Sequence, residues 1–184
     1  MLLQACATAC CWLAPLFVQK TRPPAPAVSL AGEKKSPAAI VTWAAARTAR
    51  RVRDGSALRG PVDAAAKPLP EVHSIWELVL HVAVWDDAAR CRLGGKKWQP
   101  TGLANFPAVT KPSEAAWRRA VAAAKRTHDR LVKTVAALPD SRLGDRVPGK
   151  RYDFYHMLHG IAQHELYHAG QIAILKKTRA RSGR

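Results

Sequence analysis

The stretch QHELYHAGQI, residues 163–172, places two histidines one helical turn apart. His164, Glu165 and His168 spell H-E-x-x-H, the helical signature with which metalloproteases hold zinc. On a helix the two imidazoles lie about 40° apart around the axis and roughly 6 Å apart along it. Both can therefore reach one ion at the metal–nitrogen distance of about 2.0–2.1 Å.

The residues downstream of the motif nevertheless disfavour a peptidase. In metalloproteases of this pattern the third ligand lies downstream, and the glutamate, here Glu165, is the general base. The sixteen residues after His168 contain no His, Asp or Glu. A third ligand must therefore come from upstream.

The upstream candidate is His81, because all three histidines occupy positions where a helical core is expected. The apolar stripe of the last helix is Met157, Ile161, His164, His168, Ile172 and Leu175. His81 lies on the stripe of an earlier helix, between Leu78 and Trp85. An unpaired polar ring in a core costs a few kcal/mol, and one divalent ion would satisfy all three rings. The pattern predicts a metal site of His81, His164 and His168.

Other interpretations of the histidines stay open. A lone buried histidine is usually a hydrogen-bonded structural residue. His128 occupies a stripe position on another helix and is either a fourth ligand or a polar residue at the edge of the core. His159 lies about 140° around the helix from His164, which argues against a shared ion.

Local signals predict the helices that carry these residues. Ser74 and Glu77 form a capping box at the start of one helix, and Gly94 and Gly95 end it. Another helix begins near Ser113, with a stripe of Trp117, Val121, Ala124, His128, Leu131, Val135 and Leu138. Asp153 is placed to cap the last helix. The loop to about Pro112 is long enough to cross a bundle from end to end. The expected fold is all-α, a four-helix bundle with a long crossover connection.

The two ends of the chain differ in composition from the predicted bundle of residues 38–178. Residues 1–37 are expected to be a disordered arm, because they hold three prolines within four positions. Residues 38–59 predict a first helix, although their apolar spacing is poor. Residues 179–184 predict a basic tail. The apolar residues 1–18 lack a basic start and a cleavage site, so we expect neither a signal peptide nor a membrane span.

Charge and cysteine content narrow the class of protein. The net charge is +17, but residues 71–175 contain fifteen Lys and Arg against ten Asp and Glu, so the ends supply most of the excess. No nucleic-acid motif accompanies this charge, and a nucleic-acid partner is disfavoured. Three of the four cysteines lie in the first dozen residues without a spaced framework. This usage favours the reducing cytoplasm.

Two segments resemble the DinB-like superfamily, also called the DinB/YfiT-like metalloenzymes. They are HSIWELVLHVAVWDDA, from His73, and YDFYHMLHGIAQHELYHAGQIAILKK, from Tyr152. The resemblance covers roughly residues 56 to 178. It implies a four-helix bundle with unusual connectivity and a divalent ion, zinc or nickel, held by His81, His164 and His168. The residue after the first histidine of the pair varies in kind in this family, so Glu165 is expected to be incidental.

The resemblance also implies a small-molecule substrate. Several relatives transfer low-molecular-weight thiols, such as mycothiol or bacillithiol, to electrophiles, and metal-dependent thiol transfer is the expected function. The alternatives are metal-dependent hydrolysis and a non-catalytic, metal-stabilised bundle in stress response. A homodimer is one alternative for the oligomeric state.

Glu77 and Gln171 lie three or four residues from a predicted ligand and are candidates to hydrogen-bond the ligands. The competing interpretation is that Glu77 serves only the capping box and that Gln171 lies on the helix surface. The sequence does not identify the catalytic residues.

Overall fold

A computed structural model of the chain describes residues 60–68 and 71–181. The helices are α3 (Pro61–Ala65), α4 (Ile75–Leu93), α5 (Gly102–Asn105), α6 (Glu114–Ala136), the 3-10 helix η2 (Asp140–Arg142) and α7 (Phe154–Arg181). Within these residues the only β pairing is an isolated bridge between Arg146 and Asp153. The all-α prediction is confirmed for the described part of the chain.

Several predicted segments lie outside the described residues. They are the arm of residues 1–37, the first helix of residues 38–59 and the end of the basic tail, residues 182–184. The long helices α4, α6 and α7 are therefore the members of the predicted bundle that the structure describes. None of the described helices is both long enough and apolar enough to cross a membrane.

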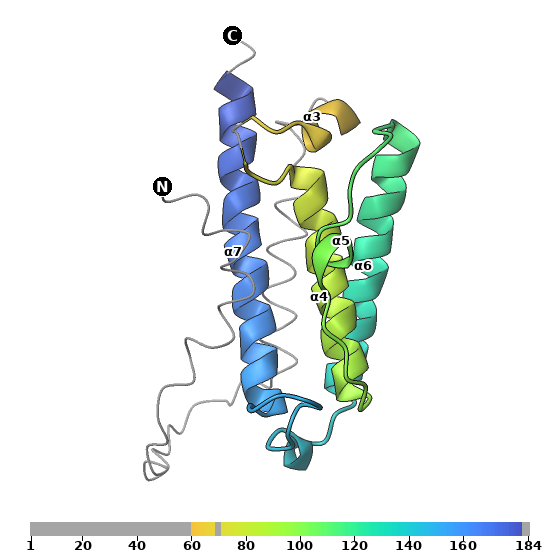
Figure 1. Cartoon of the computed structure of the whole chain (residues 1–184), viewed down its shortest axis with the longest axis vertical. Coiled ribbons are helices and arrows are strands. Elements are labelled where there is room, and N and C mark those ends of the chain that lie inside the picture. The colour runs from red at the N-terminus through yellow and green to blue at the C-terminus, as the bar shows by residue number, and fades with distance from the viewer. Residues whose placement is uncertain (1–59, 69–70, 182–184) are drawn as a thin grey trace.

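Helix α4 is the central element, because it packs against both α6 and α7. Helices α4 and α6 run in the same direction, and α7 runs opposite to them (Figure 1). The segment between α4 and α6 returns along the length of the bundle and contains the short helix α5 (Figure 1). This segment is the predicted crossover connection, and it covers one side of α4.

Helix α4 begins where the sequence predicts, because Ser74 and Glu77 form a reciprocal cap. Oγ of Ser74 accepts a hydrogen bond from the backbone N–H of Glu77 at 3.2 Å, and Oε2 of Glu77 accepts one from the N–H of Ser74 at 2.8 Å. These bonds satisfy N–H groups that the start of a helix leaves without an intrahelical partner. Gly95, two residues after the helix ends at Leu93, has a φ of 87°, a conformation that glycine adopts at little cost.

The other long helices also begin at the predicted caps. Oγ of Ser113 accepts a hydrogen bond from the N–H of Ala116 at 3.3 Å at the start of α6. Oδ1 of Asp153 accepts one from the N–H of His156 at 2.9 Å at the start of α7. Because each cap sets where a helix begins, it also sets which of its residues lie level with those of the neighbouring helices.

The apolar core forms two clusters at different levels of the bundle. One cluster contains Ala89, Leu93, Leu131, Val135, Val147, Phe154, Met157, Leu158 and Ile161. The other contains Ile75, Leu78, Val79, Ile172 and Leu175. Each fully buried aliphatic side chain contributes about 1.5–3 kcal/mol relative to exposure. The core therefore has apolar burial to offset the cost of polar groups placed between the clusters.

A polar layer separates these clusters along α4 and α7. We define it by the six residues His81, Asp86, His128, His164, Glu165 and His168. His81 and His168 are fully buried, and Asp86 and Glu165 are nearly so. Ionisable groups are seldom buried without partners, so this layer is where the chemistry of the protein should be sought.

Candidate metal centre

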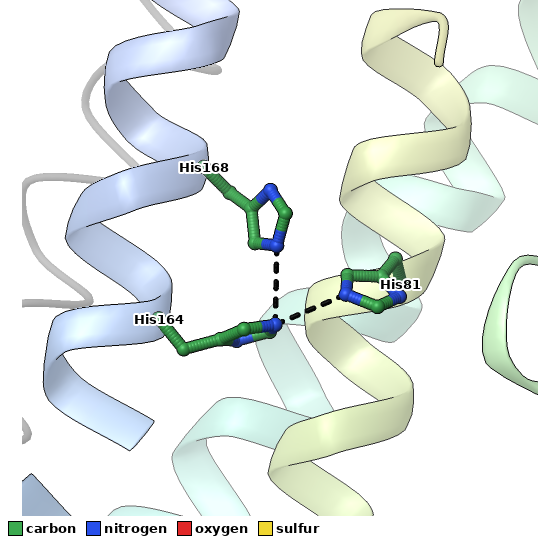
Figure 2. Close-up of side chains that lie close together, drawn as sticks. All are labelled: His81, His164 and His168. Atoms are coloured by element: carbon green, nitrogen blue, oxygen red, sulfur yellow. Dashed lines mark hydrogen bonds between the residues drawn. The ribbon is translucent and has the colours of Figure 1, made fainter. Parts of the chain in front are cut away.

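Three imidazoles of the polar layer converge on one point between α4 and α7. His81 comes from α4, and His164 and His168 come from successive turns of α7 (Figure 2). Nε2 of His164 lies 3.0 Å from Nε2 of His81 and 3.1 Å from Nε2 of His168. The structure thus brings together the three histidines that the sequence singled out.

The outer nitrogens of two of these rings are already engaged. Nδ1 of His81 lies 2.7 Å from the backbone carbonyl of Asn105, and because a carbonyl can only accept, Nδ1 donates. Nδ1 of His168 likewise donates to Oε1 of Gln171 at 2.6 Å. A neutral imidazole carries one N–H, so the Nε2 atoms of His81 and His168 present lone pairs to the centre.

Hydrogen bonds among the three rings cannot satisfy all of their ring nitrogens. A single N–H on Nε2 of His164 lies in the ring plane and can be aimed at only one of its two neighbours. Nδ1 of His164 is buried without a hydrogen-bond partner among the described residues. In a tetrahedral zinc site with metal–nitrogen distances of about 2.0–2.1 Å, the ligand nitrogens lie about 3.3 Å apart. The observed separations are close to that value, and the three residues fit a divalent ion.

Burial holds the three histidines in the form that binds a metal. It lowers the pKa of His81 to about 3 and the pKa of His168 to about 4, in each case against the hydrogen bond to the outer nitrogen. It also lowers the pKa of His164 well below its usual value, and the neighbouring histidines add to this effect. All three rings are therefore neutral at pH 7, and metal binding does not have to displace a proton from an imidazolium.

The crossover connection builds one wall of the centre around His81. Asn105 accepts from His81 through its backbone and from Nε1 of Trp85 through Oδ1, at 2.8 Å. The ring of Phe106 stacks on His81 with 3.9 Å between centroids, and His73 stacks on the other face of Phe106 at 3.6 Å. Asn105 and Phe106 were not predicted from the sequence, because nothing in the loop itself indicates which helix it will cover.

A comparison with protein-family models identifies the family of this chain. The model of the DinB superfamily matches residues 47–172, which is more than half of the chain. The chain belongs to the DinB superfamily. The match includes α4, α6 and all three histidines of the centre. Searches of the curated proteins and of the solved structures found no match.

The two residues expected to support the ligands lie in different places in this member of the DinB superfamily. Gln171 hydrogen-bonds His168, and its Nε2 donates to the hydroxyl of Tyr167 at 3.2 Å. Glu77 bonds Ser74 in the capping box and pairs with Lys67 at 3.0 Å. These bonds of Glu77 are those of a helix start, whereas Gln171 reaches a predicted ligand directly.

The glutamate of H-E-x-x-H points away from the histidine centre of the DinB bundle, towards α6. Oε1 of Glu165 lies 3.4 Å from Nδ1 of His128, and Oδ2 of Asp86 lies 3.2 Å from the same nitrogen. Burial raises the pKa of Asp86, and it raises that of Glu165 to about 8. Burial also lowers the pKa of His128, but its bonds to the two carboxylates outweigh this and raise that pKa to about 10.

Sequence reasoning named His128 and Glu165 but missed Asp86 and the grouping of the three residues, although a signal was present. Asp86 comes after Leu78 and Val82 at four-residue spacing on a buried stripe of α4, and Glu165 occupies the same kind of position between Ala162 and Ala169 on α7. A charged residue at a core position on each of two helices indicates that the pair meets. From the sequence, Glu165 was interpreted as the glutamate of the zinc motif and was expected to be incidental.

Proposed function

We propose that the chain binds a divalent ion, zinc or nickel, through Nε2 of His81, His164 and His168, and that it transfers a low-molecular-weight thiol to a small electrophile. The observation that carries the proposal is the convergence of three neutral imidazole nitrogens, with the N–H groups of His81 and His168 turned outward. Three protein ligands leave at least one position for an exogenous group, which is the catalytic arrangement of zinc sites.

When bound, the ion would lower the pKa of a thiol or water at its open position and so supply the nucleophile. The protein residues bind and orient. Asn105 and Gln171 hold the tautomers of His81 and His168, so that both Nε2 atoms remain available. Phe106 covers a face of His81 and limits the access of water to that ligand.

The position of the cysteine within the described residues supports a thiol that is supplied by a cosubstrate. The free cysteine there is Cys91, ten residues after His81 on α4. Ten residues of helix span about 15 Å, so this sulfur is too distant to act at the centre. The sulfur nucleophile would therefore come from a small molecule, such as mycothiol or bacillithiol, which the reducing cytoplasm can supply.

The test is a metal analysis combined with a screen of thiols against electrophiles, on untagged full-length protein. We expect turnover that requires both the added thiol and the metal, and that is lost after chelation and in His81→Ala. Turnover that is independent of thiol would replace the proposal with metal-dependent hydrolysis. No turnover across the panel, with a large fall in Tm on chelation, would favour a metal-stabilised bundle without catalysis.

A further inference from the structure

The second group of the polar layer joins three helices at one point. Asp86 comes from α4, His128 from α6 and Glu165 from α7. One ligand-capable atom from each residue lies within 4.8 Å of the others. Asp86 is 2 % exposed and Glu165 is 1 % exposed, whereas the side chain of His128 retains 18 %. The group is therefore buried in the bundle and reaches solvent on the α6 side.

A single ring nitrogen of His128 faces both carboxyl groups. Nδ1 of His128 lies 3.2 Å from Oδ2 of Asp86 and 3.4 Å from Oε1 of Glu165, but it carries at most one hydrogen to direct at them. Oδ1 of Asp86 is fully buried and has no hydrogen-bond partner among the residues that the structure describes. An ionised carboxylate is costly to bury, so a bound cation is one way in which these carboxyl groups can be neutralised.

We propose that Asp86, His128 and Glu165 form a second site for a divalent cation. Two carboxylates, a neutral imidazole and a divalent ion sum to zero charge, so the ion can neutralise these three side chains in place of protons. The ion would take the place of the proton on Nδ1 of His128, because a metal ligand must be deprotonated. The observed nitrogen–oxygen separations of 3.2 and 3.4 Å suit neighbouring ligands of one ion.

The donor atoms set the kind of ion that this site prefers. Two carboxylate oxygens and one nitrogen make a harder set than the three imidazoles of the first centre, and carboxylates suit Mn²⁺ in particular. The partial exposure of His128 provides an entry route that does not pass through the histidine centre. This proposal stands independently of thiol transfer, because it rests on different residues and a different ion.

The probe is Mn²⁺, because carboxylates suit this ion better than imidazoles or thiolates do. The His81→Ala substitution removes one proposed ligand of the first centre. Untagged full-length protein with this substitution is treated with a chelator to remove bound metal and is then titrated with Mn²⁺. The free aqueous ion is read by electron paramagnetic resonance. The test variant adds Asp86→Asn, which keeps the shape of the side chain and removes its charge. The matched control adds Asp87→Asn, whose carboxylate pairs with Arg90 rather than with the cluster.

We expect His81→Ala and its Asp87→Asn form to bind one Mn²⁺ per chain with the same Kd. The Asp86→Asn form should show a Kd raised about a hundredfold or more. Circular dichroism must show that each variant is folded, and His128→Gln replaces Asp86→Asn if that variant is not. The proposal is overturned if His81→Ala binds no stoichiometric Mn²⁺, or if removal of the ligand leaves the Kd unchanged.

Discussion

Oε1 of Gln171 lies 2.6 Å from Nδ1 of His168, one turn earlier on α7. This hydrogen bond settles which nitrogen of His168 carries the proton, and it turns the Nε2 lone pair towards His164. Residues that hold the ring of a metal-binding histidine typically change metal affinity by 10–100-fold when they are removed.

We therefore expect Gln171→Ala to weaken zinc binding by about 10–100-fold without unfolding the protein. The measurement is a competition titration against a chromophoric chelator. Gln163→Ala is the matched control, because Gln163 is an exposed glutamine on the same helix and should leave the affinity unchanged. Equal affinities of wild type and Gln171→Ala would show that the bond does not support the site.

Replacing a proposed ligand should have a larger effect. His164→Ala removes the ring whose Nε2 contacts both other histidines, and two imidazoles make a weak site. We expect the variant to retain one equivalent of zinc less than wild type by elemental analysis after dialysis. His156→Ala is the control, since this exposed histidine pairs with Asp153 at the start of α7. A full zinc complement in His164→Ala would remove His164 from the ligand set.

The start of α4 should be important for stability, since its cap positions His81. Ser74→Ala removes a buried hydroxyl that accepts from the N–H of Glu77, and we expect the free energy of unfolding to fall by about 0.5–2 kcal/mol. Urea denaturation measures this change. Ser113→Ala removes an exposed cap of α6 that lacks the reciprocal bond, so its loss should be smaller. Equal losses would show that the capping box adds nothing beyond a single bond.

The metal-free protein should lose stability in mild acid because of the buried histidines. The folded pKa of His168 is about 4, below its unfolded value of 6.5, so the unfolded chain binds the proton first. Stability from this residue is fully present above pH 6.5 and falls as the pH drops towards 4. The slope approaches about 1.4 kcal/mol per pH unit.

The comparison of wild type with His168→Gln isolates this contribution, because the carboxylates of Asp86 and Glu165 are present in both proteins. Urea midpoints of chelator-treated protein at about pH 4 to 7 give the difference. We expect the stability of wild type to fall more steeply with acid than that of His168→Gln. Parallel curves would mean that His168 is protonated as readily in the folded protein as in the unfolded chain.

The predictions that held depend on contacts close in sequence. Ser74 with Glu77, Ser113 and Asp153 each bond a backbone N–H within three residues, so the letters alone locate the helix starts. The length of the segment between α4 and α6 likewise predicted a crossover, because chain length limits which ends of a bundle it can join. Helical periodicity also placed His81, His164 and His168 on buried stripes, together with His128.

The sequence by itself thus determined the helices, their buried stripes and the histidines that lie on them, since helical periodicity depends only on local geometry. Tertiary structure decided how those stripes align. Packing of α4 on α7 brings the three Nε2 atoms together, and packing of α4 on α6 pairs Asp86 with His128, whose Nδ1 also lies 3.4 Å from Oε1 of Glu165. The contacts of Asn105 and Phe106 with His81 also required the folded crossover. They join residues about 24 positions apart in the sequence. The relative position of such residues is set by how the helices pack, and local helix geometry does not fix it.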